Sequence, residues 1–558
     1  MHRQAAWAEI NATLRAKGFE EKQGSIPEYH GRLNIHGAAV DVSLTIPDLT
    51  FMELPVIRLL DRSQLAPGVL GHVFHNLDVD SGICYASGVG LPLDLFSPGG
   101  SILRVLEQAK KALEVNYAGR GVTEVTAEYQ DYWRESREPF RILTNREESG
   151  NHATTLGYHY FTPEVGRPFF ALCDAAELYG HNSEQYRTAL LIQTDQELGP
   201  VDGCKVPTDL SDLETWFKGQ SAFAGSDWAK VEAALFDQGF VAISAANCIL
   251  GVRLQFPADV KIGLRQNTIR KDKVARILSS RRSKIGISRY GGYWTDLRSI
   301  AQRNLTGLET LAGQSIAIVG CGTIGSHLAK FLVQSGAGAN APLTLIDRQV
   351  LASGNVGRHY LGSSRIGEAK AKGMRDELRR FHPQANVTAL VGDATDFWDE
   401  INAADLIIDA TGEWNTQYAL NNRFRAGEHN ASAILHCWVS GNGAAARSFL
   451  NLSDDEFCFR CLRPNMKDQE RYPALKPNVE ANIAEATCGE GAFYPYSVAA
   501  PAIAAALACD VAISWANGNP GPRLRTQVLD HDRAIHRKPT MPSRHKDCPS
   551  CGSQNQDD

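Results

Sequence analysis

Apolar positions recur at two different spacings along the chain, and the spacing changes from region to region. Residues 5–17 and 101–115 carry apolar side chains every three or four positions, which predicts amphipathic helices. Between them, residues 32–35, 39–46 and 54–60 form short apolar runs bounded by Gly, Pro and Asp, which predicts strands. A helix, a strand meander and a second helix therefore predict an N-terminal α+β domain, which we end at residue 150.

The next region, residues 151–290, has a mixed pattern. It predicts a strand at 189–193, a helix at 228–238 and strands near 241–250. No chemical motif stands in this region, so we interpret it as a connecting α/β domain.

Beyond residue 290 the pattern alternates regularly. A strand at 315–319, a glycine turn at 320–325, a helix to residue 334 and a strand at 343–346 follow one another. This order is the opening of a doubly wound, Rossmann-like nucleotide-binding domain. Residues 291–558 are therefore the third predicted domain, and the chain as a whole is predicted to be of the α/β class.

Composition and charge narrow the class of protein. At roughly 150 residues per domain, 558 residues predict three or four domains. Hydrophobic residues make up 43% and charged residues 22%, which excludes a disordered chain. A net charge of −6 gives no electrostatic reason to expect nucleic acid or an anionic membrane as a partner. The sequence has neither a signal-peptide pattern nor an apolar run long enough to span a bilayer, so we expect a cytoplasmic protein.

The glycine turn is the first candidate site. Gly320, Gly322 and Gly325 stand where a chain must turn sharply, approach a phosphate closely and pack a helix on a strand. Asp347, at the end of the next strand, is placed to accept hydrogen bonds from ribose hydroxyls. This fingerprint alone is most typical of a nicotinamide or flavin oxidoreductase, an alternative that stays open at this point.

Four further candidate residues follow the glycine turn along the chain, in the order Asn355, Arg358, Lys370 and Asp409. With the glycine turn, they resemble the adenylating ThiF family, which includes ubiquitin-activating enzymes and bacterial activators of sulfur-carrier proteins. The resemblance implies ATP as cofactor, with the Asn-x-x-Arg segment and Lys370 on its phosphates and Asp409 on Mg²⁺. The family's arginine-rich segment before the first strand is missing, and residues 298–303 are only a loose substitute. The arginine that reaches the γ-phosphate is therefore not assigned.

Two C-x-x-C pairs lie far apart in the chain, at Cys458 and Cys461 and at Cys548 and Cys551. This spacing lets neighbouring thiolates share one tetrahedral Zn²⁺, and four thiolates complete a closed structural site. A redox C-x-x-C and scattered structural thiols are the alternatives. We expect zinc to tie the polar C-terminal tail to the nucleotide domain.

Cys488 lies between these pairs, flanked by glycine and followed by an Ala-rich helix from about residue 497. Thioester-forming activating enzymes carry a cysteine on a crossover segment before such a helix, and Cys488 resembles it. A position close to a helix N-terminus also favours a thiolate.

Cys84 and Asn76 are the candidates in the N-terminal domain. Asn76 precedes Cys84 by eight positions, as the asparagine of the His-Pro-Asn motif precedes the cysteine in ubiquitin-conjugating enzymes, which this region resembles. Phe74 and His75 replace the motif's histidine and proline. The resemblance implies that Cys84 carries an acyl group as a thioester while the Asn76 amide hydrogen-bonds the oxyanion.

Together the two halves resemble the CD-NTase-associated ubiquitin-transferase-like proteins of CBASS antiphage systems. The resemblance implies adenylation of the C-terminal, glycine-like tail of a protein, capture by Cys488, passage to Cys84 and transfer to a target amine. It also implies a CD-NTase as the activated protein and a homodimer. A ubiquitin-like or sulfur-carrier protein as cargo, an NAD-dependent oxidoreductase and a non-catalytic scaffold are the alternatives.

Overall fold

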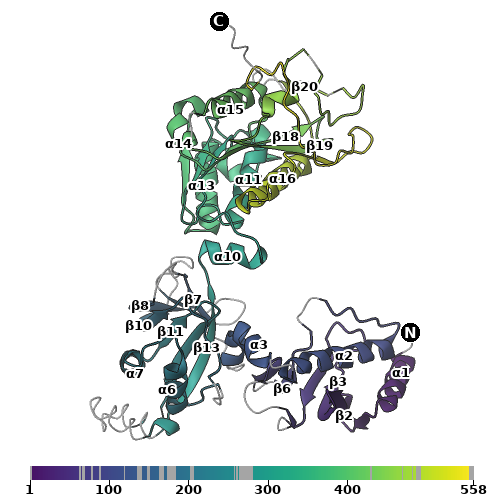
Figure 1. Ribbon diagram of the computed structural model, residues 1–558, viewed down its shortest axis with the longest axis vertical. Coiled ribbons are helices and arrows are strands. Elements are labelled where there is room, and N and C mark those ends of the chain that lie inside the picture. Colours follow the sequence, from purple (N-terminus) through teal and green to yellow (C-terminus); the bar gives the residue numbers. More distant parts are fainter. Residues whose placement is uncertain are drawn as a thin grey trace. The chain divides into compact units, whose positions relative to one another are not determined.

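The structure divides the chain into two compact units, Met1–Thr295 and Asp296–Asp558, which are described separately (Figure 1). It is a computed structural model. It describes residues 3–24, 26–61, 64–65, 70–76, 79–86, 90–117, 120–134, 141–146, 151–161, 169–172, 184–201, 206–256, 258, 262, 281–427, 430–467, 469–480, 482–485 and 492–551.

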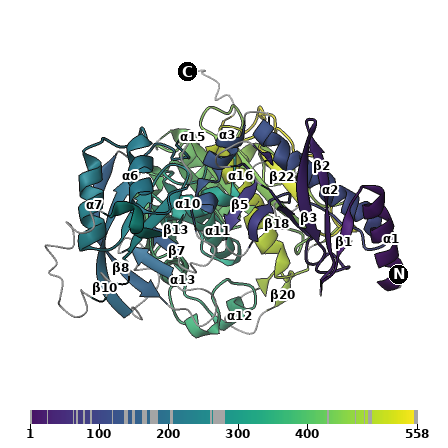
Figure 2. The same cartoon turned by 90° about the horizontal axis from the view of Figure 1, so that it is seen from below.

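The first unit opens with a six-stranded antiparallel sheet in the order β1-β2-β3-β4-β6-β5. Its strands are Glu20–Lys22, Glu28–Ile35, Ala38–Thr45, Val56–Leu59, Val73–Asn76 (β5) and Val79–Ile83 (β6). Helix α1 (Arg3–Ala16) packs against α2 (Pro98–Tyr117), and α2 packs on β2 (Figure 2). Side chains that recur at helical spacing, such as Ile102 and Leu106 of α2, fill the core between the helices and the sheet.

A closed barrel follows in the same unit, with strand order β10-β11-β12-β13-β7-β9-β8. Its strands are Arg141–Thr144 (β7), His152–Phe161 (β8), Phe169–Leu172 (β9), Glu184–Gln193 (β10), Val241–Ser244 (β11), Ile249–Gln255 (β12) and Gly286–Trp294 (β13). Helices α6 (Leu210–Gly219) and α7 (Asp227–Asp237) cover it and share a core with the strands. The connecting region is thus a barrel with added helices.

The boundary expected at residue 150 lies inside this barrel. Strand β7 pairs in parallel with β13, and the short helices α3 (Gly121–Ala127) and α4 (Tyr129–Trp133) precede it. Trp133 is fully buried and donates its indole N–H to the carbonyl of Gly251, 3.2 Å away. The barrel core therefore begins with α3. A four-residue strand and two short helices carry too little periodicity to reveal that from sequence.

The second unit is a seven-stranded sheet in the order β16-β15-β14-β17-β18-β19-β22. The first five strands are parallel, as a doubly wound fold requires, and β19 and β22 extend the sheet antiparallel. The strands are Ile316–Val319 (β14), Leu343–Ile346 (β15), Val387–Leu390 (β16), Leu406–Asp409 (β17), Ala433–Ser440 (β18), Ala445–Leu452 (β19) and Leu524–Val528 (β22). This confirms the predicted Rossmann-like fold.

The helices of this unit are Leu297–Asn304 (α10), Thr323–Gln334 (α11), Ser353–Val356 (α12), Lys370–Phe381 (α13), Trp398–Asn402 (α14), Trp414–Ala426 (α15) and Ala499–Ala516 (α16). Of these, α11, α13, α15 and α16 pack on the strands of the sheet. In the described part of the chain, α16 alone is long and apolar enough to cross a membrane by length and composition. It packs against α11, β18 and β19, which accounts for its apolar face as core.

Candidate functional site

The carboxyl ends of three neighbouring strands coincide at one edge of the C-terminal sheet. Val319, the last residue of β14, pairs with Ile346 of β15 on one side and with Asp409 of β17 on the other. The residues that follow these strands, Gly320 and Asp347 among them, therefore meet at one place. Ligands of open α/β sheets bind outside the carboxyl ends of the strands, so this edge is the candidate nucleotide site.

The glycines have distinct roles in the turn. Gly320 has φ +93°, a left-handed conformation that favours glycine. A Cβ on Gly325 would lie 1.8 Å from the carbonyl oxygen of Gly320, so only glycine allows α11 to begin here. Gly322, the N-cap of α11, faces open space, with nothing within 4 Å of a Cβ built on it. The first N–H groups of α11 lack partners within the helix, and such groups are suited to bind an anion.

Asp347 stabilises this turn through hydrogen bonds to the backbone. Its carboxylate accepts the backbone N–H of Cys321 at 2.7 Å through one oxygen and that of Gln349 at 2.6 Å through the other. The predicted bonds to a ribose would use the remaining lone pairs of these oxygens.

Lys370 is a buried cation at the start of α13. It is 4% exposed, and its Nζ donates to the side-chain carbonyl of Gln349 at 2.6 Å. Burial lowers the pKa of Lys370, and the nearby Asp347 opposes the shift. No ion pair of Lys370 occurs among the described residues. A buried ammonium without a bonded counter-ion is expected to attract an anionic ligand.

The segment between Asn355 and Leu361 is fastened to the glycine turn by a histidine that the sequence reading missed. Nε2 of His359 donates to the carbonyl of Cys321 at 2.7 Å, and its Nδ1 accepts the N–H of Leu361 at 3.0 Å. Burial lowers the pKa of His359 to about 4, so the ring is neutral at pH 7. Asn355 accepts the N–H of Ala352 within its own turn, and Arg358 lies half-buried with its guanidinium over Tyr496.

Asp409 does not fit the magnesium role expected for it. Its side chain has no solvent exposure. One carboxylate oxygen accepts the N–H and the hydroxyl of Thr411, at 3.0 and 2.7 Å, and the other lies 2.8 Å from Nδ1 of His436. Mg²⁺ binds in proteins with several of its waters retained, and a sealed carboxylate has no room for them.

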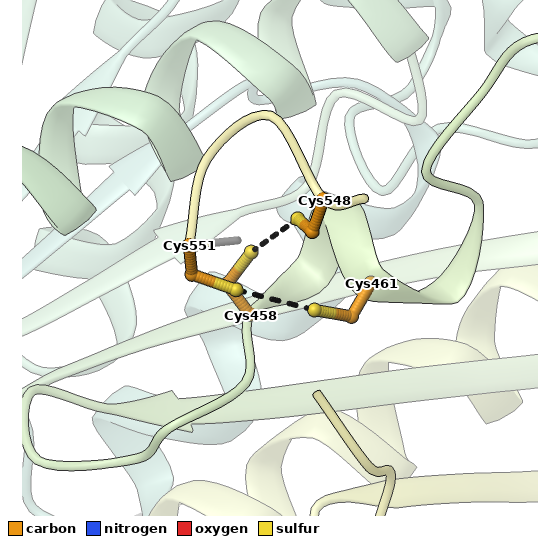
Figure 3. Close-up of side chains that lie close together, drawn as sticks. All are labelled: Cys458, Cys461, Cys548 and Cys551. Atoms are coloured by element: carbon orange, nitrogen blue, oxygen red, sulfur yellow. Dashed lines mark hydrogen bonds between the residues drawn. The ribbon is translucent and has the colours of Figure 1, made fainter. Parts of the chain in front are cut away.

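The four cysteines of the two C-x-x-C pairs converge, as Figure 3 shows. Their sulfur atoms all lie within 4.8 Å of one another, with Cys458 and Cys548 3.7 Å apart and Cys461 and Cys551 3.2 Å apart. Tetrahedral zinc with four thiolates places its sulfurs about 3.8 Å from each other, so the donor set fits a structural metal.

Asn421 of α15 supports this cluster and was not found from sequence. Its side-chain N–H₂ points to the sulfur of Cys458 at 3.7 Å, and its carbonyl accepts the N–H of Phe459 at 3.0 Å. Asn421 is fully buried, so the first cysteine pair is fastened to the helix that follows β17. Cys437 and Cys509 lie apart from the cluster, and burial raises the pKa of both thiols, that of Cys509 to about 11.

Cys84 follows β6 in the first unit and is half-exposed. Its N–H donates to the carbonyl of His72 at 2.8 Å, and the N–H of His72 donates to the hydroxyl of Tyr132. Partial burial raises the pKa of Cys84, and the negative charges of Glu128 and Asp131 add to the shift. The thiol is therefore accessible and mainly protonated at neutral pH.

The backbone register does not bring Asn76 to Cys84. Strands β5 and β6 form a hairpin in which Asn76 pairs with Val79, while Cys84 follows the opposite end of β6. Cys84 follows Val79 by five positions, which in extended chain is roughly 16 Å. The side chain of Asn76 lies outside the described part of the chain, so its expected oxyanion role stays a prediction.

Cys488 lies outside the described residues. The strands on either side of its segment, β20 (Ala484–Glu485) and β21 (Ala492–Phe493), pair antiparallel. The role expected for Cys488 stays a prediction.

Two family models match the two ends of the chain. Residues 4–142 match the prokaryotic E2 family B, and residues 296–550 match the ThiF family. The chain thus joins a ubiquitin-conjugating-like domain to a ThiF-type adenylating domain.

Over nearly its full length, the chain is similar to the ATP-dependent ubiquitin transferase-like protein Cap2 of Pseudomonas aeruginosa. The two are 28% identical over 98% of this chain and 99% of that protein. Cap2 of Escherichia coli strain TW11681 is 26% identical over 50% of this chain and 48% of its own length. Among solved structures, Escherichia coli MccB with ATP covers 46% of this chain and 70% of its own, with 17% identity and a TM-score of 0.34.

Proposed function

We propose that this chain is an ATP-dependent ubiquitin transferase-like enzyme that activates the C-terminus of a protein and conjugates it to an amine. The observation that carries the proposal is Lys370, a buried cation without an ion pair among the described residues, beside the glycine turn. The phosphates of ATP would supply the negative counter-charge that Lys370 lacks. The full-length similarity to Cap2, an ATP-dependent ubiquitin transferase-like protein, supports this activity.

The first step is adenylation. An oxygen of the substrate's terminal carboxylate attacks the α-phosphorus of ATP, and the bond to pyrophosphate breaks. Lys370 and Arg358, with the first N–H groups of α11, meet the negative charge on the phosphoryl oxygens. The products are an acyl adenylate and pyrophosphate.

Two thiol transfers and one amide formation follow. The thiol of Cys488 attacks the acyl carbon, AMP leaves, and the acyl group is held as a thioester. The thiol of Cys84 takes the acyl group from Cys488, and an amine of the target then displaces Cys84 to form an amide. Holding both thiols in one chain raises the effective concentration of the second for the first.

The substrate we propose is a CD-NTase with a glycine-ended tail, and its conjugation places the enzyme in CBASS antiphage defence. We further propose Zn²⁺ as the ion of the four thiolates, a homodimer as the assembly and the cytoplasm as the location. A ubiquitin-like or sulfur-carrier protein is the alternative cargo.

Pyrophosphate exchange tests the proposal directly. The full chain should exchange labelled pyrophosphate into ATP only when a protein with a free glycine-ended tail is present. A CD-NTase and a ubiquitin-like protein are compared as substrates, each with a tail-truncated control. Exchange with neither, or tight NAD binding in place of ATP binding, would refute the proposed function.

A further inference from the structure

The buried carboxylate of Asp409 holds the Thr411 segment, which packs against the glycine turn. It accepts both the N–H and the hydroxyl of Thr411, at 3.0 and 2.7 Å, and so fixes the bend after β17. A Cβ placed on Gly320 would lie 3.1 Å from the methyl carbon and from the nitrogen of Thr411. The Thr411 bend is therefore in close contact with the turn that borders the nucleotide site.

His436 completes the bonding of this carboxylate from the neighbouring strand. It pairs with Asp409 in the register of β17 and β18, and its Nδ1 lies 2.8 Å from the second carboxylate oxygen. Both side chains are fully buried. Within the described side chains, Nε2 of His436 has no hydrogen-bond partner, so the bond to Asp409 is what orients the ring.

The ring of His436 also touches the segment that carries the first cysteine pair. It stacks on Phe459, with ring centroids 4.2 Å apart and planes 23° apart. Phe459 lies between Cys458 and Cys461, and its N–H is held by Asn421. A continuous series of contacts thus runs from the cysteine cluster through Phe459, His436 and Asp409 to the Thr411 bend.

We propose that Asp409 and His436 are positioning residues that hold the glycine turn in its nucleotide-binding shape, and that Phe459 links them to the cysteine cluster. The inference rests on the proposed function, because it takes the glycine turn as the ATP site. A positioning role of Asp409 and His436 differs from a metal-ligand role in one measurable respect. A positioning pair supports nucleotide binding equally with and without magnesium, whereas a metal ligand supports only the magnesium-dependent part.

The experiment measures the dissociation constant of ATP for the full chain by calorimetry, in buffer with Mg²⁺ and in buffer freed of it. Asp409→Asn and His436→Phe remove one member of the pair, and His436→Phe retains a ring that can stack on Phe459. His436→Asn retains a donor near the Nδ1 position. Asp405→Asn is the matched control, because Asp405 holds the N–H of Ser315 at the opposite end of the same strands.

We expect Asp409→Asn and His436→Phe to weaken ATP about tenfold, by the same factor in both buffers. His436→Asn should recover part of that loss, and Asp405→Asn should bind like the wild type. A loss confined to the magnesium buffer in Asp409→Asn would overturn the proposal in favour of a metal ligand. Wild-type affinity in folded Asp409→Asn and His436→Phe would overturn it as well.

Thr411→Val decides between the outcomes if the Asp409 and His436 variants do not fold, since it removes only a hydroxyl and keeps the shape of the side chain. It should weaken ATP severalfold in both buffers, and unchanged affinity would refute the positioning role. If the wild type binds no ATP at all, the proposed function fails, and this inference fails with it.

The link to the cysteine cluster has its own test. Cys551→Ser alters the half-exposed cysteine and should weaken ATP severalfold in the wild-type background. In Phe459→Leu, where the ring stack is lost, the same change should cost much less. Equal losses in both backgrounds would show that Phe459 is not the link.

Discussion

Lys370 differs from most other cations of the C-terminal unit because it is buried without an ion pair among the described residues. Most of those cations lie at the surface or are paired with carboxylates, whereas Lys370 is buried with a carboxamide as its bonded neighbour. Burying a cation costs free energy that a phosphate oxygen can offset. This buried and unpaired charge is the reason that we propose a phosphate contact for Lys370.

Lys370→Ala should lose about ten- to a hundredfold in ATP affinity. A hydrogen bond to a charged group contributes about 1.5–3 kcal/mol, and each 1.4 kcal/mol is tenfold in affinity. Calorimetry with ATP measures the change. Lys372→Ala, an exposed lysine on the same helix, is the control, and an equal loss there would contradict a specific phosphate contact.

His359 predicts a pH dependence of stability. Its pKa is about 4 in the fold, below its usual 6.5, so the unfolded chain takes up the proton first as the pH falls. Stability from the neutral ring is complete above pH 6.5 and is lost towards pH 4, up to about 3 kcal/mol.

The measurement is urea unfolding of the wild type and of His359→Gln, from pH 7 to pH 4.5. Because glutamine does not titrate, the stability of the wild type should fall relative to the variant as the pH is lowered. A constant difference between the two curves would contradict the assignment.

The thiol of Cys84 should respond to the carboxylates of the neighbouring helical segment. Glu128→Gln removes a negative charge that disfavours the thiolate, so the pKa of Cys84 should fall and alkylation at pH 7.5 should become faster. Mass spectrometry of the Cys84 peptide after iodoacetamide treatment measures this rate. Glu124→Gln, one helical turn earlier, should leave it unchanged.

The strands and the C-terminal tail of the second unit are held in place by different interactions. The parallel strands are buried and pair in register, whereas the polar tail up to Cys551 is fastened by the cysteine cluster. The free energy of metal binding at such a cluster is free energy of folding for the segments that it joins.

Cys548→Ser should therefore abolish stoichiometric metal binding and release the tail. Elemental analysis measures the metal content, and limited proteolysis reports whether the tail is exposed. Cys509→Ala, a buried cysteine of α16 outside the cluster, should keep one metal per chain. Retained metal with a protected tail in Cys548→Ser would contradict the structural role.

The proposed function divides the chemistry of the whole chain between its two units. In that proposal adenylation takes place at the C-terminal sheet, and the final transfer uses Cys84 of the first unit. Cys84→Ala should therefore keep pyrophosphate exchange at the wild-type rate and lose the amide-linked product, as seen by mass spectrometry of the target. Loss of exchange in a folded Cys84→Ala protein would refute this division.

Local sequence patterns were enough to establish the fold class. The alternation of strand, glycine turn and helix predicted the Rossmann-like domain, and the helix and meander of the first domain predicted an α+β domain. Turn residues and the periodicity of apolar positions are local properties of the sequence, so they can be recognised without knowing the tertiary structure. Spacing also indicated which cysteines could share a metal ion.

Contacts between distant segments could not be predicted in this way. The bond of Asp409 to His436 and the stack of His436 on Phe459 join residues that are 27 and 23 positions apart. The hairpin register that separates Asn76 from Cys84 likewise depends on pairing between strands. Motif spacing records distance along the chain, whereas exposure and hydrogen bonding depend on which segments pack together in space.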